Sequence, residues 1–126
     1  DFYYKKGDYK KTIILTYGGP SQEILKVYRK KNVSFILFNK LHPLDANLLN
    51  KVLNDYQKIL VVEDHLNGNN LYSSICEMFF NHRSDQKIYS LSPKNFNLKV
   101  GRKPDYFYKA HMLDEQSILK KLETII

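Results

Sequence analysis

Short runs of consecutive apolar residues, separated by segments with helical spacing, constrain the fold of this chain most strongly. Residues 59–62 read Ile-Leu-Val-Val, and similar runs occupy 12–17 (TIILTY) and 33–38 (VSFILF). Such runs are typical of strands buried on both faces of a sheet, because a strand with one wet face alternates apolar and polar residues. A shorter and more polar run at 86–91 predicts a fourth strand nearer an edge.

Each of these strands is followed by an amphipathic segment. Helices are predicted after Ser21 through about residue 31, after Asp45, at about 70–81 and after Asp114, with Ser21, Asp45 and Asp114 as N-caps of three of them. Alternation of strand and helix requires right-handed crossovers, which predicts an α/β domain with a mainly parallel sheet and helices on both faces. The segment 106–108 (Tyr-Phe-Tyr) is either a last short strand or a packed loop.

Length and composition allow one domain and argue against several functions. The chain has 126 residues with 43% hydrophobic and 26% charged residues, which is typical of a globular domain. The aromatic and basic residues 1–11 are expected to be a linker from an upstream domain, and residues 12–126 to be the domain itself. No apolar run reaches the roughly 20 residues that span a bilayer, and the single cysteine, Cys76, favours a cytoplasmic setting.

The net charge of +7 is spread along the chain in small groups. Most of the basic residues are lysines, whereas readout of base edges depends largely on arginine. We therefore expect solvated basic surface and no specific nucleic-acid partner. The four histidines lie on separate predicted elements without metal-ligand spacing, so no metal site is predicted.

Two sets of polar residues are candidates for a functional site. Glu63, Asp64 and His65 follow the strand at 58–62, at the edge of an α/β sheet where ligands and partner domains bind. They could act in acid–base chemistry, but contact with a neighbouring domain is the favoured interpretation. Gly18, Gly19 and Ser21 lie between a strand and a helix, where backbone N–H groups can bind an anion. No complete phosphate-binding motif is present there, so a structural turn is favoured.

Four segments together resemble the C-terminal domain of the transketolase group of thiamine-diphosphate enzymes. They are GDYKKTIILTYG, LHPLD, KILVVEDH with the following Gly/Asn loop and SSICEMF, and KPDYFYKAHMLDEQSILKKLETII. Pro43-Leu44-Asp45 and Glu63-Asp64-His65 are the most specific pieces. The group includes whole and split transketolases, deoxyxylulose-phosphate synthases and pyruvate dehydrogenase beta subunits. Its usual Gly-Gly-x-Gly turn is altered here, with Gly68 followed by Asn69, Asn70 and Tyr72.

The resemblance implies a three-layer α/β/α domain with a mixed sheet of about five strands, one of them antiparallel. It implies a domain that supports the structure and dimer of a two-carbon transferase and is inactive alone. Thiamine diphosphate and magnesium would then be bound by upstream or separate domains of a homodimeric enzyme, and this chain would supply no catalytic, cofactor-binding or metal-binding residue. Two alternatives stay open: a stand-alone module that binds an anion or small ligand, and a subunit domain of a 2-oxoacid dehydrogenase or oxidoreductase.

Overall fold

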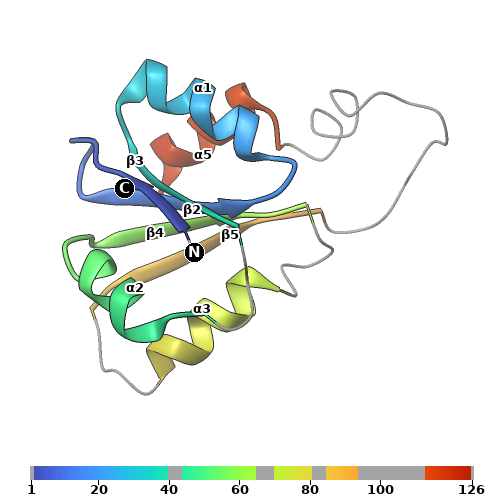
Figure 1. Cartoon of the computed structure of the whole chain (residues 1–126). Helices are drawn as coiled ribbons and strands as arrows, with labels where there is room; N and C mark the ends of the chain where they lie inside the picture. The colour runs from blue at the N-terminus through green and yellow to red at the C-terminus, as the bar shows by residue number, and fades with distance from the viewer. Residues whose placement is uncertain (1, 40–43, 65–69, 81–84, 94–112, 126) are drawn as a thin grey trace, which may run out of the picture.

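The structure is a computed structural model that describes residues 2–39, 44–64, 70–80, 85–93 and 113–125 (Figure 1). Five strands form one sheet, and four helices are described. The strands are β1 (Phe2–Lys5), β2 (Thr12–Tyr17), β3 (Ser34–Phe38), β4 (Lys58–Val62) and β5 (Lys87–Leu91). The helices are α1 (Ser21–Lys31), α2 (Ala46–Leu53), α3 (Leu71–Phe80) and α5 (Glu115–Thr124).

The sheet has the order β1-β3-β2-β4-β5, with only β1 antiparallel to its neighbour. Thr16 pairs with Val62 across β2 and β4, so Tyr17 and Glu63 leave adjacent strands at the same edge. The predicted strands at 12–17 and 58–62 have the observed bounds, and those at 33–38 and 86–91 begin one residue later than predicted. The segment 106–108 lies outside the described residues.

Two apolar clusters fill the space on the two faces of the sheet. Helices α2 and α3 cover one face and α1 and α5 cover the other (Figure 1). Alternate residues of the central strands supply the two clusters: Ile13 and Ile59 face α2 and α3, and Ile14 and Leu60 face α1 and α5. This pattern explains why the strands read as continuous apolar runs. The three-layer α/β/α fold with a mixed, mainly parallel five-stranded sheet is therefore confirmed.

The predicted linker at 1–11 was wrong in one respect, because Phe2–Lys5 forms the edge strand β1. Its partner β3 lies about thirty residues away in sequence, so no local pattern indicates the pairing. The chain then passes so close to α1 that a Cβ on Gly7 would lie 2.0 Å from the carbonyl oxygen of Asn32. Whether residues 1–11 also connect to an upstream domain stays a prediction.

A series of hydrogen bonds between hydroxyl groups connects β1 to the centre of the sheet. Tyr56 donates to Ser34 Oγ at 2.8 Å, and Ser34 both donates to the carbonyl of Gly7 and accepts from its N–H. Because the Tyr56 proton is used in this way, Tyr4 must be the donor in the 2.5 Å contact between the two tyrosine oxygens. The pKa of Tyr4 is raised, first by burial and then by this hydrogen bond.

The ends of the helices differ in how they are capped. Asp45 caps α2 as predicted, accepting the Leu48 N–H at 3.1 Å. Ser21 was wrongly predicted as a cap: it is the first residue of α1, and the cap position is held by Pro20 without a side-chain hydrogen bond. Asp114 occupies the cap position of α5 but accepts from Ser117 Oγ and from no backbone N–H of the described residues.

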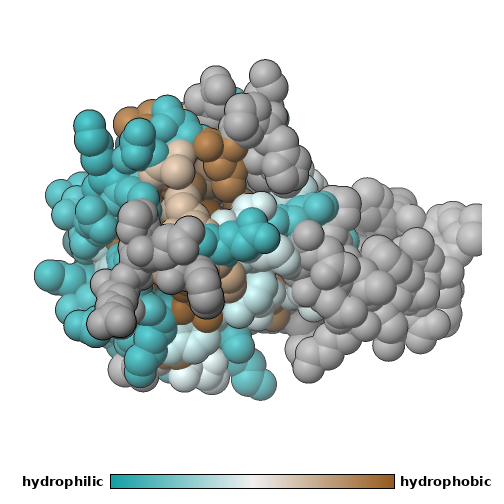
Figure 2. All heavy atoms as spheres, turned by 90° about the horizontal axis from the view of Figure 1, so that it is seen from below, coloured by the Kyte–Doolittle hydropathy of each residue, from teal (hydrophilic) through white to brown (hydrophobic). Residues whose placement is uncertain are grey.

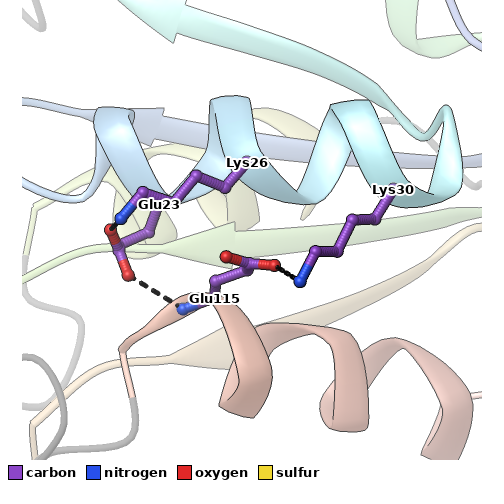
Figure 3. A network of polar contacts seen from close by, with 4 residues as sticks. All are labelled: Glu23, Lys26, Lys30 and Glu115. Atoms are coloured by element: carbon purple, nitrogen blue, oxygen red, sulfur yellow. Dashed lines mark hydrogen bonds and ion pairs between the residues drawn. The ribbon is translucent and has the colours of Figure 1, made fainter.

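Helix α5 takes its cap from α1 instead (Figure 3). Glu23 Oε1 accepts the backbone N–H of Glu115 at 3.0 Å, while Glu23 Oε2 pairs with Lys26 at 2.9 Å. The Glu115 carboxylate in turn pairs with Lys30 of α1. These contacts join residues 92 positions apart in sequence and hold α5 against α1. No helix in the described part of the chain is long and apolar enough to cross a membrane.

Candidate functional site

The polar residues at the carboxyl edge of the sheet are organised around Glu63. The backbone N–H of Glu63 donates to the carbonyl of Leu91 at 3.1 Å, which extends the β4–β5 ladder by one residue. This bond fixes the backbone of Glu63 directly after the end of β4. The side chain has no exposed surface.

Three donors surround the buried Glu63 carboxylate. The first backbone N–H groups of α3, those of Leu71 and Tyr72, donate to it at 2.9 and 3.2 Å, and Tyr17 Oη donates at 3.1 Å. A helix N-terminus carries unsatisfied N–H groups and a partial positive charge, so it suits a carboxylate. Burial of a charge is costly unless it is fully hydrogen-bonded, and these contacts offset that cost.

Tyr17 and Asn70 form a second layer around the carboxylate. Asn70 Nδ2 donates a hydrogen bond to Tyr17 Oη at 3.2 Å, and the Tyr17 hydroxyl donates its own hydrogen bond to Glu63. The pKa of Tyr17 is raised, mainly by burial, with the negative charges of Glu63 and Asp64 adding to the effect and the Asn70 hydrogen bond opposing it. Tyr17 therefore stays neutral and remains a donor across the physiological range.

This geometry assigns different roles to the three residues predicted as inter-domain contacts. The carboxylate oxygens of Glu63 are engaged inside the chain, so its described contacts anchor α3. Asp64 is only partly buried and leaves the same edge of the sheet. His65 lies outside the described residues. Contact between this edge and another domain stays a prediction.

The altered glycine turn of the family resemblance ends at the N-terminus of α3. Asn70 is used to position Tyr17, and Tyr72 is half-buried against the core on the α2 and α3 side. A hydrogen bond with Cys76, together with burial, raises the pKa of the Tyr72 phenol. A tyrosine thus fits where a glycine was expected, and its backbone N–H still binds Glu63.

The second candidate set, Gly18, Gly19 and Ser21, forms a turn before α1. Gly18 has a φ of +67° and its carbonyl accepts the Ser21 N–H at 3.2 Å, so one helix N–H is already used. Glu23 adds a carboxylate to the first turn of α1. An anion-binding role for these residues stays a prediction. Within the described ranges, no group of three or more histidine, cysteine or acidic side chains could hold a metal ion.

Sequence reasoning missed Tyr17 and Asn70. Tyr17 lies one strand away from Glu63 and 46 residues earlier, and only the β2–β4 register brings the two together. The signal that could have found Tyr17 is its position directly after Thr16, at the end of a strand predicted to be parallel to the strand before Glu63. Nothing local to Asn70 indicates its partner.

Sequence comparison finds relatives of one enzyme type, although no known family profile matches the chain. Two 1-deoxy-D-xylulose-5-phosphate synthases from strains of Clostridium perfringens are 27% and 28% identical over 99 residues. That of Clostridium tetani is 26% identical over 101 residues. These alignments cover 77 to 79% of this chain, which spans 16% of the length of those relatives.

Structure comparison supplies the second observation. A solved split-gene transketolase, described as an inactive beta4 tetramer, matches with a TM-score of 0.80 over 96% of this chain and 41% of its own, at 12% identity. The chain therefore has the fold of the matched part of this transketolase, and its sequence is similar to part of the 1-deoxy-D-xylulose-5-phosphate synthases. A 2-oxoglutarate:ferredoxin oxidoreductase from Magnetococcus marinus shares this domain's fold at a TM-score of 0.57, 11% identity, over 97% of this chain and 20% of its own.

Proposed function

We propose that this domain is the C-terminal part of a thiamine-diphosphate-dependent transferase of two-carbon units, of the transketolase or deoxyxylulose-phosphate synthase type. The observation that carries the proposal is the likeness to 1-deoxy-D-xylulose-5-phosphate synthases over more than three quarters of the chain. The fold likeness to a split-gene transketolase supports it independently. In the complete enzyme, thiamine diphosphate stabilises the carbanion of the transferred unit.

The role we assign to this chain is structural, and the domain alone is inactive. The Glu63 carboxylate has no exposed surface and three donors within the chain, so it cannot reach a substrate proton. It holds α3 in place next to Asp64 at the carboxyl edge of the sheet. That edge is the proposed contact with the domains that bind thiamine diphosphate and magnesium.

The face formed by α2 and α3 offers apolar surface for assembly. Figure 2 views this side, where hydrophobic side chains are visible between hydrophilic ones. Leu48 of α2, on this face, is 47% exposed. Such surface supports burial against another part of the enzyme, or against its second copy in a homodimer.

Reconstitution tests this proposal. The chain is mixed with the thiamine-diphosphate-binding domains encoded upstream in frame or by the adjacent gene, and association is measured by light scattering after size exclusion. We expect a stable complex that forms deoxyxylulose phosphate from pyruvate and glyceraldehyde phosphate, or transfers a ketol unit between sugar phosphates, while the chain alone does neither. No association, or no thiamine-diphosphate-binding domain encoded there, overturns the proposal.

The same preparation tests the oxidoreductase alternative. The fold likeness to a 2-oxoglutarate:ferredoxin oxidoreductase is weaker than the likeness to the transketolase, and it shows the fold alone. A reconstituted oxidoreductase would reduce ferredoxin only when coenzyme A is present. Reduction of ferredoxin without sugar-phosphate chemistry would therefore select that alternative.

A further inference from the structure

The amino-terminal edge of the sheet, opposite the Glu63 site, contains a surface hollow that the function proposed above does not use. Its volume is about 340 Å³, within the range of small-molecule sites. The turn between α2 and β4 and the beginning of β5 form its walls. The residues that line it are Asn54, Tyr56, Gln57, Lys58, Asp85, Gln86 and Lys87.

Backbone hydrogen bonds make this hollow a preformed feature. The Lys11 carbonyl accepts the N–H groups of Gln57 and Lys58 at 2.9 and 3.3 Å, and the Gln57 carbonyl accepts the Lys87 N–H at 3.0 Å. The beginnings of β2, β4 and β5 are thereby joined at Gln57. Gln86 Nε2 adds bonds to the carbonyls of Leu53 and Tyr56, which tie β5 to the turn after α2.

Two lysines, Lys58 and Lys87, are among the residues that line the hollow. Lys58 and Lys87 are direct partners in the β4–β5 register, and side chains in register lie on the same face of a sheet. Neither ammonium group has an ion pair with any residue that the structure describes. Like charges directly opposite each other on neighbouring strands destabilise a sheet, so an anion between them would relieve a repulsion built into the fold.

Other basic residues at the amino-terminal edge of the sheet add to the positive potential around the hollow. Because strand direction is shared, the loops before β2, β3, β4 and β5 all lie at this edge. Basic residues at this edge include Lys10, Lys11, Lys31, Lys51, Lys58 and Lys87, and acidic residues include Asp8, Asp55 and Asp85. A concave surface with a positive field concentrates small anions.

We propose that this hollow binds a small, multiply charged anion of the phosphate or carboxylate class through Lys58 and Lys87. The side-chain amides of Asn54 and Gln57 would donate further hydrogen bonds to the oxygens of the ligand. Among the described residues of the lining, Asp85 is the one carboxylate, and its repulsion limits the affinity.

Pyrophosphate titration of the ¹⁵N-labelled 126-residue chain, followed by NMR, tests this site. We expect saturable shifts at residues 54–58 and 85–87. The double variant Lys58→Gln with Lys87→Gln should weaken binding at least about tenfold, the effect of losing roughly 1.4 kcal/mol. The matched control, Lys26→Gln with Lys120→Gln, removes the same charge from the middle of α1 and α5, outside the set of basic residues at this edge, and should retain affinity within about threefold.

A further variant should tighten pyrophosphate binding, a result that misfolding could not produce. Asp85→Asn removes an exposed carboxylate and should tighten pyrophosphate binding about threefold. Citrate competition then shows whether the site also takes carboxylates, or phosphates alone. Shifts that do not saturate, equal weakening by both double variants, or shifts confined to Gly18 and Gly19 would each overturn the proposal.

Discussion

The Glu63 carboxylate is a charge removed from water and held by three donors, and its energetic role can be isolated by substitution. Glu63→Gln keeps the shape but turns an amide NH₂ toward groups that are themselves donors. We expect a loss of about 1–3 kcal/mol in the free energy of unfolding, because buried donors lose their acceptor. Urea denaturation measures the change, with the exposed Glu77→Gln of α3 as control. A loss below about 0.5 kcal/mol would contradict the anchoring role.

Substitution of two glycines by alanine distinguishes the cost of a steric clash from the cost of an unfavourable backbone conformation. Gly7→Ala places a methyl group 2.0 Å from the Asn32 carbonyl oxygen and should cost about 1–3 kcal/mol, because backbone must move. Gly18→Ala meets nothing within 4 Å but requires a φ of +67°, so its cost should be only about 1 kcal/mol. Hydrogen exchange distinguishes the two: Gly7→Ala should also expose the β1 amides. Equal protection of β1 in both variants would contradict the steric explanation.

Ionisation of Tyr4 and Tyr17 is expected to lower the stability of the fold at alkaline pH. The folded pKa values of Tyr4 and Tyr17 lie above the ordinary value of about 10, so folding favours their neutral forms. Their contribution to stability is complete below pH 10 and decreases as the pH rises from there toward the folded pKa. Denaturation between pH 8 and 11 should show this loss. In Tyr17→Phe, the free energy of unfolding should depend less on pH than in the control Tyr3→Phe, whose tyrosine is exposed. Equal pH dependence in the two variants would show that Tyr17 is not responsible for the loss.

At the scale of elements, α5 depends on a cap that another helix supplies. Glu23→Ala removes the acceptor of the Glu115 N–H, and loss of a cap costs about 1 kcal/mol. We expect faster amide exchange in the first turn of α5. Loss of the ion pair between Glu23 and the exposed Lys26 adds little, because such a pair is worth less than about 1 kcal/mol. Glu123→Ala, at the other end of α5, is the control and should leave the first turn unchanged.

The elements that could be predicted from the sequence are those whose signal is local. Apolar runs gave β2 and β4 their observed bounds, and Asp45 was recognised as a cap because the N–H that it accepts lies in the first turn of its own helix. Strand β1 has only four residues and pairs with β3, which is distant in sequence, so its own segment resembled a linker. The acceptor for the first N–H of α5 could not be predicted for the same reason, since Glu23 is distant in sequence.

The candidate site follows the same division. The position of Glu63 at the carboxyl edge of the sheet was predictable, because the apolar run before it fixes where β4 ends. Its burial was not, because the donors that offset the cost come from Tyr17, on another strand, and from the first turn of α3. A polar residue after a buried strand can therefore anchor the next helix as well as face a ligand, and only tertiary contacts decide between these roles.

At the scale of the whole molecule, the roles assigned to Glu63 and Asp64 predict different effects in a complete enzyme. Asp64 is partly exposed at the proposed inter-domain edge, so Asp64→Lys should weaken association with the thiamine-diphosphate-binding domains about tenfold while changing the stability of this chain by less than about 0.5 kcal/mol. Glu63→Gln should lower stability first and association only as a consequence. Light scattering and urea denaturation on both variants separate the two effects.

The control for this comparison is a charge reversal of the same kind at a different edge. Asp55 is exposed in the turn before β4, at the amino-terminal edge of the sheet, so Asp55→Lys changes the net charge as Asp64→Lys does. If the carboxyl edge is the contact surface, Asp55→Lys leaves association unchanged. If both reversals weaken association equally, long-range charge rather than a contact at Asp64 controls assembly, and the inter-domain surface must lie elsewhere, with the apolar α2 and α3 face around Leu48 as the next surface to vary.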